Sequence, residues 1–200
     1  MEQEQEKNNK RIFITGTGRC GTTFIMLILT HLKLRVGFSI DNIDKNITKT
    51  CNSGLEKFWT DGTYIVKDIS IIKIPNQVVQ TLKDHSLELE HVFIPIRNYE
   101  DSAKSRFSLG GGAGGLWPHG RAVDVKSQKE FFYEVMSEYL YAMTVHDIPT
   151  TFINFDKMVE SPKYLYEKLQ PVLLKDISFE EFEISYNFAS EHQKSGKRQY

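Results

Sequence analysis

The sequence predicts an α/β fold, a three-layer sandwich with a central parallel sheet between two layers of helices. Short apolar runs typical of buried strands alternate along the chain with segments in which apolar residues recur every three to four positions. A glycine-rich turn joins the first apolar run to the first helical segment. No long linker or internal repeat divides the chain, so we expect a disordered polar tail over residues 1–10 and a single domain over residues 11–200.

Each expected element follows from its local pattern. Strands are expected at residues 12–14, 35–40, 64–66, 91–96 and 150–155. Helices are expected at residues 22–32, 75–83, 99–107, 127–146, from 162 onward, and 179–192. Ser161 and Pro162 combine a helix cap with a proline at the first turn. Leu140 belongs to the apolar stripe of the helix over residues 127–146, which we expect to face the core. Residues 41–62 and 110–120 are expected to be irregular.

Composition limits the classes of function. The 25 basic and 26 acidic side chains nearly cancel, so we expect neither nucleic acid nor a membrane surface as a partner. The two cysteines, Cys20 and Cys51, have no metal-ligand spacing. The N-terminus lacks the apolar middle of a signal peptide, and the apolar run over residues 24–29 is too short to span a bilayer. We therefore expect a cytoplasmic protein.

The residues between the first expected strand and the first expected helix have the features of a phosphate-binding loop. Gly16 and Gly21 have the spacing of the nucleotide-hydrolase pattern G-x-x-x-x-G-K-[ST], and Thr23 stands at the position of its metal-binding hydroxyl. Glycines allow backbone N–H groups to converge on an anion, and the start of the helix adds positive partial charge. Thr22 replaces the lysine of the pattern, so we expect phosphate binding without ordinary triphosphate hydrolysis. A glycine-rich turn without a ligand is the alternative.

The same loop resembles the 5′-phosphosulfate loop of sulfotransferases that use 3′-phosphoadenosine 5′-phosphosulfate (PAPS). That loop has a basic residue, a small residue and then Gly-Thr-Thr, a pattern that Arg19-Cys20-Gly21-Thr22-Thr23 fits position by position. Many family members have serine at the position of Cys20, and Arg19 replaces a lysine that several branches use. The resemblance implies a P-loop nucleotide-hydrolase-like fold. It assigns donor binding to Gly18, Arg19, Cys20, Gly21, Thr22 and Thr23.

A second motif is similar to the site at which this family binds the 3′-phosphate. The family uses an arginine at the end of a strand and a serine eight residues later in the following helix. Here the expected strand over residues 91–96 ends at Arg97, and Ser105 follows at that spacing. A helix cap at Asn98 with an unrelated surface serine is the alternative. Residues 150–174 also resemble the family's strand and proline-started helix, which supports the fold more than any site.

The resemblance implies transfer of a sulfuryl group from PAPS to a hydroxyl or amine of a small-molecule or carbohydrate acceptor. Arg19, Thr22 and Thr23 would stabilise charge on the leaving 5′-phosphate oxygen, and no metal would be required. Arg97 and Ser105 would hold the 3′-phosphate. The sequence does not identify the acceptor or the oligomeric state.

The general base is the least determined part of this hypothesis. Lys67 and Asp68 follow the expected strand over residues 64–66, at the end where α/β sites gather. Asp68 is the first candidate for the catalytic base, ahead of Glu56 and His119, although a capping role for Asp68 is the alternative. The glycine-rich segment over residues 110–120 is a candidate lid over the acceptor.

Two other functions remain open from the sequence. A small P-loop kinase would need a lysine in the loop, where Thr22 stands. A catalytically silent nucleotide-binding module would share the loop but lack a working base. The basic C-terminal residues Lys194, Lys197 and Arg198 fit a solvated terminus better than an additional phosphate contact.

Overall fold

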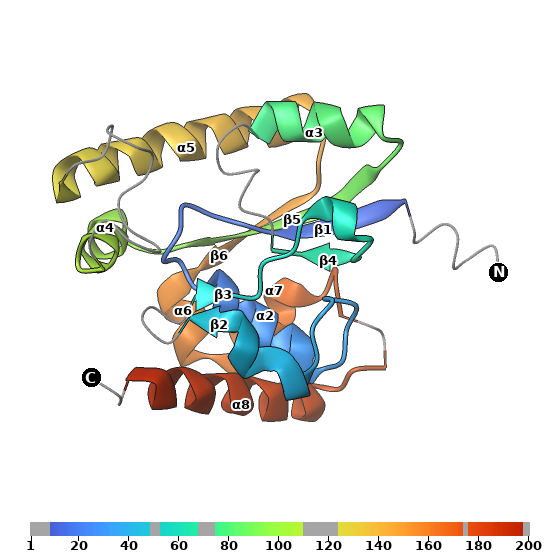
Figure 1. Cartoon of the computed structure of the whole chain (residues 1–200), viewed down its shortest axis with the longest axis vertical. Helices are drawn as coiled ribbons and strands as arrows, with labels where there is room; N and C mark the ends of the chain where they lie inside the picture. Colours follow the sequence, from blue (N-terminus) through green and yellow to red (C-terminus); the bar gives the residue numbers. More distant parts are fainter. Residues whose placement is uncertain (1–8, 49–52, 68–74, 110–123, 174–175, 198–200) are drawn as a thin grey trace.

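A four-stranded parallel sheet forms the centre of the molecule (Figure 1). The computed structural model describes residues 9–48, 53–67, 75–109, 124–173 and 176–197. The strands are β1 (Lys10–Ile14), β4 (Ile65–Val66), β5 (Glu88–Ile96) and β6 (Thr150–Asn154). They lie in the order β4-β1-β5-β6, so β1 is an inner strand with β4 on one side and β5 on the other.

Helices cover both faces of the sheet. One face is covered by α2 (Thr22–His31), α6 (Phe155–Glu160), α7 (Pro162–Leu169) and α8 (Phe179–Lys197). The opposite face is covered by α3 (Pro75–Asp84) and α5 (Val125–Val145), and α4 (Tyr99–Phe107) packs against α5. The two helical layers lie above and below the sheet in Figure 1. The predicted α/β fold with a central parallel sheet between two layers of helices is therefore confirmed.

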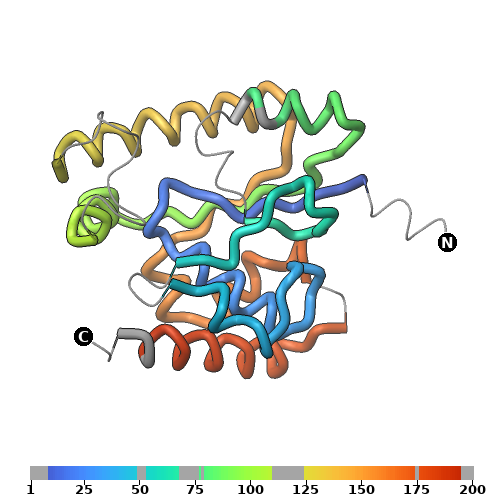
Figure 2. Tube along the Cα trace, in the orientation of Figure 1, coloured from blue at the N-terminus to red at the C-terminus, as the bar shows by residue number. Residues whose placement is uncertain are grey.

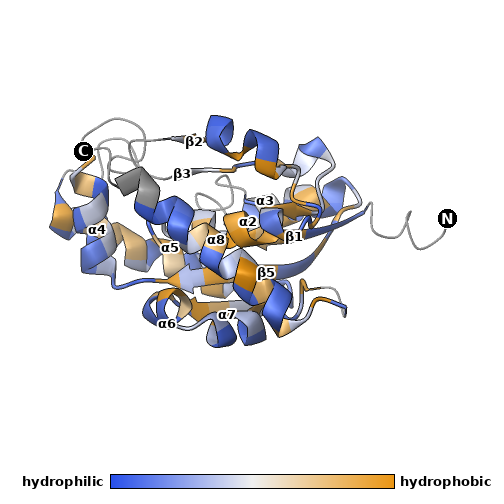
Figure 3. Cartoon of the chain, turned by 90° about the horizontal axis from the view of Figure 1, so that it is seen from below, coloured by the Kyte–Doolittle hydropathy of each residue, from blue (hydrophilic) through white to orange (hydrophobic). Residues whose placement is uncertain are grey.

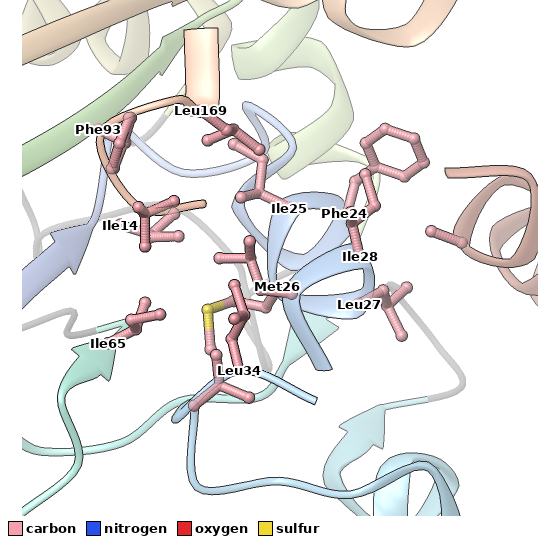
Figure 4. Packing of buried hydrophobic residues seen from close by; sticks show 14 of the residues in the cluster. Ile14, Phe24, Ile25, Met26, Leu27, Ile28, Leu34, Ile65, Phe93 and Leu169 are labelled. Atoms are coloured by element: carbon pink, nitrogen blue, oxygen red, sulfur yellow. The ribbon is translucent and has the colours of Figure 1, made fainter. Parts of the chain in front are cut away.

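The alternation of side chains along β1 explains the two separate cores. Ile12 and Ile14 point into the core under α2, while Phe13 between them points into the core under α3 and α5. Helix α2 is buried from Thr23 to Thr30 and is coloured as mainly hydrophobic in Figure 3. Figure 4 shows its side chains packed against strand residues and Leu169 of α7. Full burial of such a side chain contributes roughly 1.5–3 kcal/mol, so this core fixes the position of α2 against β1.

The chain between α2 and β4 differs from the sequence prediction. The strand expected at residues 35–40 is wrong: the segment bends at Gly37, whose φ is 72°, and enters a 3-10 helix η1 (Ile40–Asn46). A short antiparallel pair, β2 (Ile47–Thr48) and β3 (Ser53–Gly54), and a second 3-10 helix, η2 (Trp59–Asp61), follow in the region expected to be irregular. Arg35 still contacts β4, because its carbonyl accepts a hydrogen bond from the Ile65 N–H at 3.1 Å.

Three smaller differences concern the ends and faces of elements. β1 begins at Lys10, a residue that the sequence assigned to the tail. Helix α6 was not expected, because its six residues are too few to establish a periodic pattern. The prediction for Leu140 is wrong: its side chain is 51% exposed, because α5 presents only one face to the sheet and Leu140 lies outside that face.

Candidate phosphate-binding site

The carboxyl ends of β1 and β5 define the position of the site. From β1 the chain continues into α2 on one face of the sheet, whereas from β5 it continues through α4 to α5 on the other face. The two strands are neighbours, and the chain leaves them toward opposite faces of the sheet (Figure 2). Parallel α/β sheets bind ligands at such a switch point. The predicted loop over residues 15–23 and the predicted pair Arg97 and Ser105 both lie here.

The loop after β1 adopts a backbone that requires glycine at two positions. Gly18 has φ 86° and Gly21 has φ 93°, both in the left-handed region that side chains disfavour. A Cβ on Gly18 would overlap the guanidinium of Arg106, and a Cβ on Gly21 would overlap the methyl group of Met158. Gly21 is the N-cap of α2, no side chain caps that end, and no acidic residue lies in the first turn. No carboxylate in the first turn therefore offsets the positive partial charge at the amide end of α2.

A buried lysine from β4 contacts the loop. Lys67 follows β4 directly and is 6% exposed. Its ammonium donates hydrogen bonds to the Thr23 hydroxyl at 2.9 Å and to the Gly54 carbonyl at 2.6 Å. The Glu56 carboxylate lies 3.3 Å from the same nitrogen. The loop has no lysine at position 22, and the residue after the neighbouring strand places an ammonium against Thr23.

The two arginines predicted for donor binding lie against each other. Arg19 has a left-handed backbone, with φ 58°, and its Nε donates to the Ser105 hydroxyl at 3.1 Å. Arg97 Nη1 donates to the Arg19 carbonyl at 3.3 Å. The Arg97 guanidinium also lies 4.8 Å from the centre of the Phe155 ring, which fixes its orientation through a cation–π contact. The structure therefore brings Arg19, Arg97 and Ser105 together from β1, β5 and α4.

Cys20 contributes backbone rather than a reactive side chain. Its side chain is fully buried, and its Sγ lies 2.6 Å from the position that a Cβ on Gly16 would occupy. Burial raises the pKa of the Cys20 thiol, so the group stays protonated at neutral pH. The small side chain at this position allows the loop to fold closely over β1. Cys51 lies outside the described residues.

The structure describes some of the remaining predicted residues and not others. Asp68, His119 and the candidate lid over residues 110–120 lie outside the described residues, as does Arg198. Glu56 is described, with its side chain 43% exposed beside Lys67. Lys194 is exposed on α8, and the side chain of Lys197 is not among those described. Thr22 is partly exposed at the first position of α2.

Sequence reasoning assigned no role to Lys67 and did not single out two other residues that contact this site. Lys67 was placed with Asp68 at the end of an expected strand, but its contact with Thr23 was not predicted. Phe155 follows β6 and touches Arg97, and Arg106 follows Ser105 and touches Gly18. Their contacts join segments far apart in sequence, so local spacing contained no signal for either.

Comparison of the chain with protein-family models, with curated proteins and with solved structures finds no match. Within the described part of the chain, no helix combines the length and the apolar character needed to cross a membrane. The described residues define a class of arrangement: a parallel α/β sheet with a glycine loop at its switch point, contacted by Lys67 and Arg97 and carrying Arg19.

Proposed function

We propose that this protein is a P-loop-type sulfotransferase that moves a sulfuryl group from PAPS to a hydroxyl or amine of a small-molecule or carbohydrate acceptor. The observation that carries the proposal is the convergence of Lys67, Arg19 and Arg97 on the glycine loop at the switch point. A donor with phosphates at two separated positions needs cations on both sides of such a loop. The resemblance of residues 19–23 and of the Arg97–Ser105 pair to the PAPS-binding motifs selects this donor among phosphorylated ligands.

The described contacts support a division of roles on the donor side. Loop amides between Gly18 and Thr23 and the amide end of α2 hold the 5′-phosphate. Lys67 and Arg19 lie beside these groups and neutralise negative charge that grows on the oxygen between sulfur and the 5′-phosphate. Arg97, oriented by the Phe155 ring, holds the 3′-phosphate with Ser105. Ser105 exchanges its present hydrogen bond from Arg19 for one to the phosphate.

The reaction needs a base for the acceptor proton. The acceptor oxygen or nitrogen forms a bond to sulfur while the bond from sulfur to the 5′-phosphate oxygen breaks, and the acceptor proton passes to a carboxylate. Glu56 is the candidate base among the described residues, because its partly exposed carboxylate lies 3.3 Å from the Lys67 ammonium and so faces the donor side. Asp68 remains the other candidate, since it follows Lys67 in the sequence.

The test is a thermal-shift and calorimetry panel with adenosine 3′,5′-bisphosphate, adenosine 5′-monophosphate and ATP–Mg. We expect the bisphosphate to stabilise the protein most, without added magnesium. Arg97→Ala should weaken bisphosphate binding roughly 10- to 100-fold and leave monophosphate binding nearly unchanged, since a charged hydrogen bond contributes about 1.5–3 kcal/mol. Arg35→Ala is the control, because Arg35 is exposed and contacts the Tyr64 ring instead.

The outcomes separate the competing functions. Preferential stabilisation by ATP–Mg would contradict the sulfotransferase proposal and favour a small kinase, in which Lys67, directly after β4, would act as the phosphate-binding lysine. Binding of the bisphosphate without sulfuryl transfer to any hydroxyl or amine in an acceptor library would indicate the silent module. Absence of binding to all three nucleotides would overturn the proposal.

A further inference from the structure

The last turn of α4 lies directly on the phosphate-binding loop. Ser105 accepts a hydrogen bond from Arg19, and the next residue, Arg106, lies against Gly18. The approach is so close that a Cβ at Gly18 would overlap the Arg106 guanidinium and lie 3.0 Å from its Cζ atom. The left-handed φ of 86° therefore favours glycine at position 18, and a side chain there would have to displace the end of Arg106.

Three guanidinium groups gather around the backbone of Gly18 and Arg19. Arg97 donates to the Arg19 carbonyl, the Arg19 side chain lies along Ser105, and Arg106 lies on Gly18. Like charges repel one another, and an anion bound among them reduces that repulsion. Each guanidinium also presents a planar fork of N–H donors that matches the oxygens of a phosphate.

Arg106 shares its stretch of backbone with the two residues proposed for the 3′-phosphate. Arg97 and Arg106 approach the same two-residue stretch of backbone from β5 and α4, and Ser105 precedes Arg106 on the helix. The Arg106 guanidinium thus lies on Gly18, and the next residue, Arg19, is the one that Arg97 and Ser105 contact. The 5′-phosphate, by contrast, is held by loop amides and by Lys67 on the β4 side of β1.

We infer that Arg106 is a third ligand of the donor's 3′-phosphate and determines the preference for a bisphosphorylated nucleotide. This inference rests on the proposed function. It adds a residue that the motif of an arginine and a serine eight positions later does not include. It also gives a reason for glycine at position 18, because any larger residue would displace the arginine from the phosphate.

The experiment compares Arg106→Ala and Arg106→Lys with the wild type by calorimetric titration of adenosine 3′,5′-bisphosphate and adenosine 5′-monophosphate. We expect Arg106→Ala to weaken bisphosphate binding roughly 10- to 100-fold and monophosphate binding less than about threefold. Arg106→Lys should recover only part of the loss, because it keeps the charge but not the fork. Lys104→Ala is the control on the same helix, since its side chain is 60% exposed and pairs with Glu100.

The possible results separate this inference from the proposed function. A wild type that binds no bisphosphate overturns both. A wild type that binds it, with Arg106→Ala equal to wild type or with equal losses for both nucleotides, overturns the role of Arg106 alone. Circular dichroism melts verify folding, and if Arg106→Ala does not fold, the bisphosphate-to-monophosphate affinity ratio of Arg106→Lys decides, because a packing role leaves that ratio unchanged.

Discussion

Replacing Lys67 with methionine tests how strongly the buried ammonium joins β4 to the loop. Methionine keeps the unbranched apolar stem and removes the charge together with the hydrogen bonds to Thr23 and Gly54, at 2.9 and 2.6 Å. Hydrogen bonds from a charged donor contribute about 1.5–3 kcal/mol each. Removing a buried charge returns part of this sum. The ion pair with Glu56 contributes little to the free energy of unfolding, because that carboxylate is 43% exposed.

We therefore expect Lys67→Met to lower the free energy of unfolding by about 2–4 kcal/mol. For a chain of this size, one kcal/mol corresponds to a Tm shift of roughly 2–4 °C, so Tm should fall by roughly 5–15 °C. Differential scanning calorimetry of the ligand-free protein at pH 7 measures the shift. Lys126→Met is the control, because the Lys126 side chain is 86% exposed and should change Tm by less than about 2 °C. A Lys67→Met variant as stable as the control would refute the contacts from Lys67 to the loop.

Three further substitutions test other parts of the site and sheet. Tyr139→Phe removes a buried hydrogen bond of 2.7 Å to Thr15 and should cost about 1–2 kcal/mol in urea denaturation; full additivity with Thr15→Val would contradict a shared bond. Gly21→Ala combines a left-handed φ of 93° with overlap on Met158, and should cost at least about 2 kcal/mol and abolish nucleotide binding; wild-type binding would disprove the cradle. Burial lowers the pKa of His91, so its contribution to the free energy of unfolding is complete above the unfolded pKa of about 6.5 and is lost as the pH drops below that value. His91→Gln should therefore reduce the fall in the free energy of unfolding between about pH 7.5 and 5.5. An identical fall in the variant and the wild type would exclude His91 as the cause.

Local patterns predicted the elements that local interactions define. The helix expected at residues 99–107 has those bounds in the structure, because Asn98 caps its first turn through hydrogen bonds to the amides of residues 100 and 101. The strand expected at residues 35–40 was wrong because a strand depends on a partner. Among the described residues, β4 pairs with β1 at two positions, so residues 35–40 have little edge to extend. Local sequence does not report the length of a neighbouring strand.

The sequence by itself determined the glycine loop, its cation at Arg19 and the spacing from Arg97 to Ser105. These features depend on residues close together in the chain, whose turn and helix geometry is local. Only the tertiary structure decided which cation outside the loop contacts it next to position 22. Lys67 is 44 residues from Thr23, and it contacts the loop because β4 pairs in parallel with β1. The order β4-β1-β5-β6 likewise places α4 and Arg106 on Gly18, since a strand order arises from burial of both sheet faces and not from any local pattern.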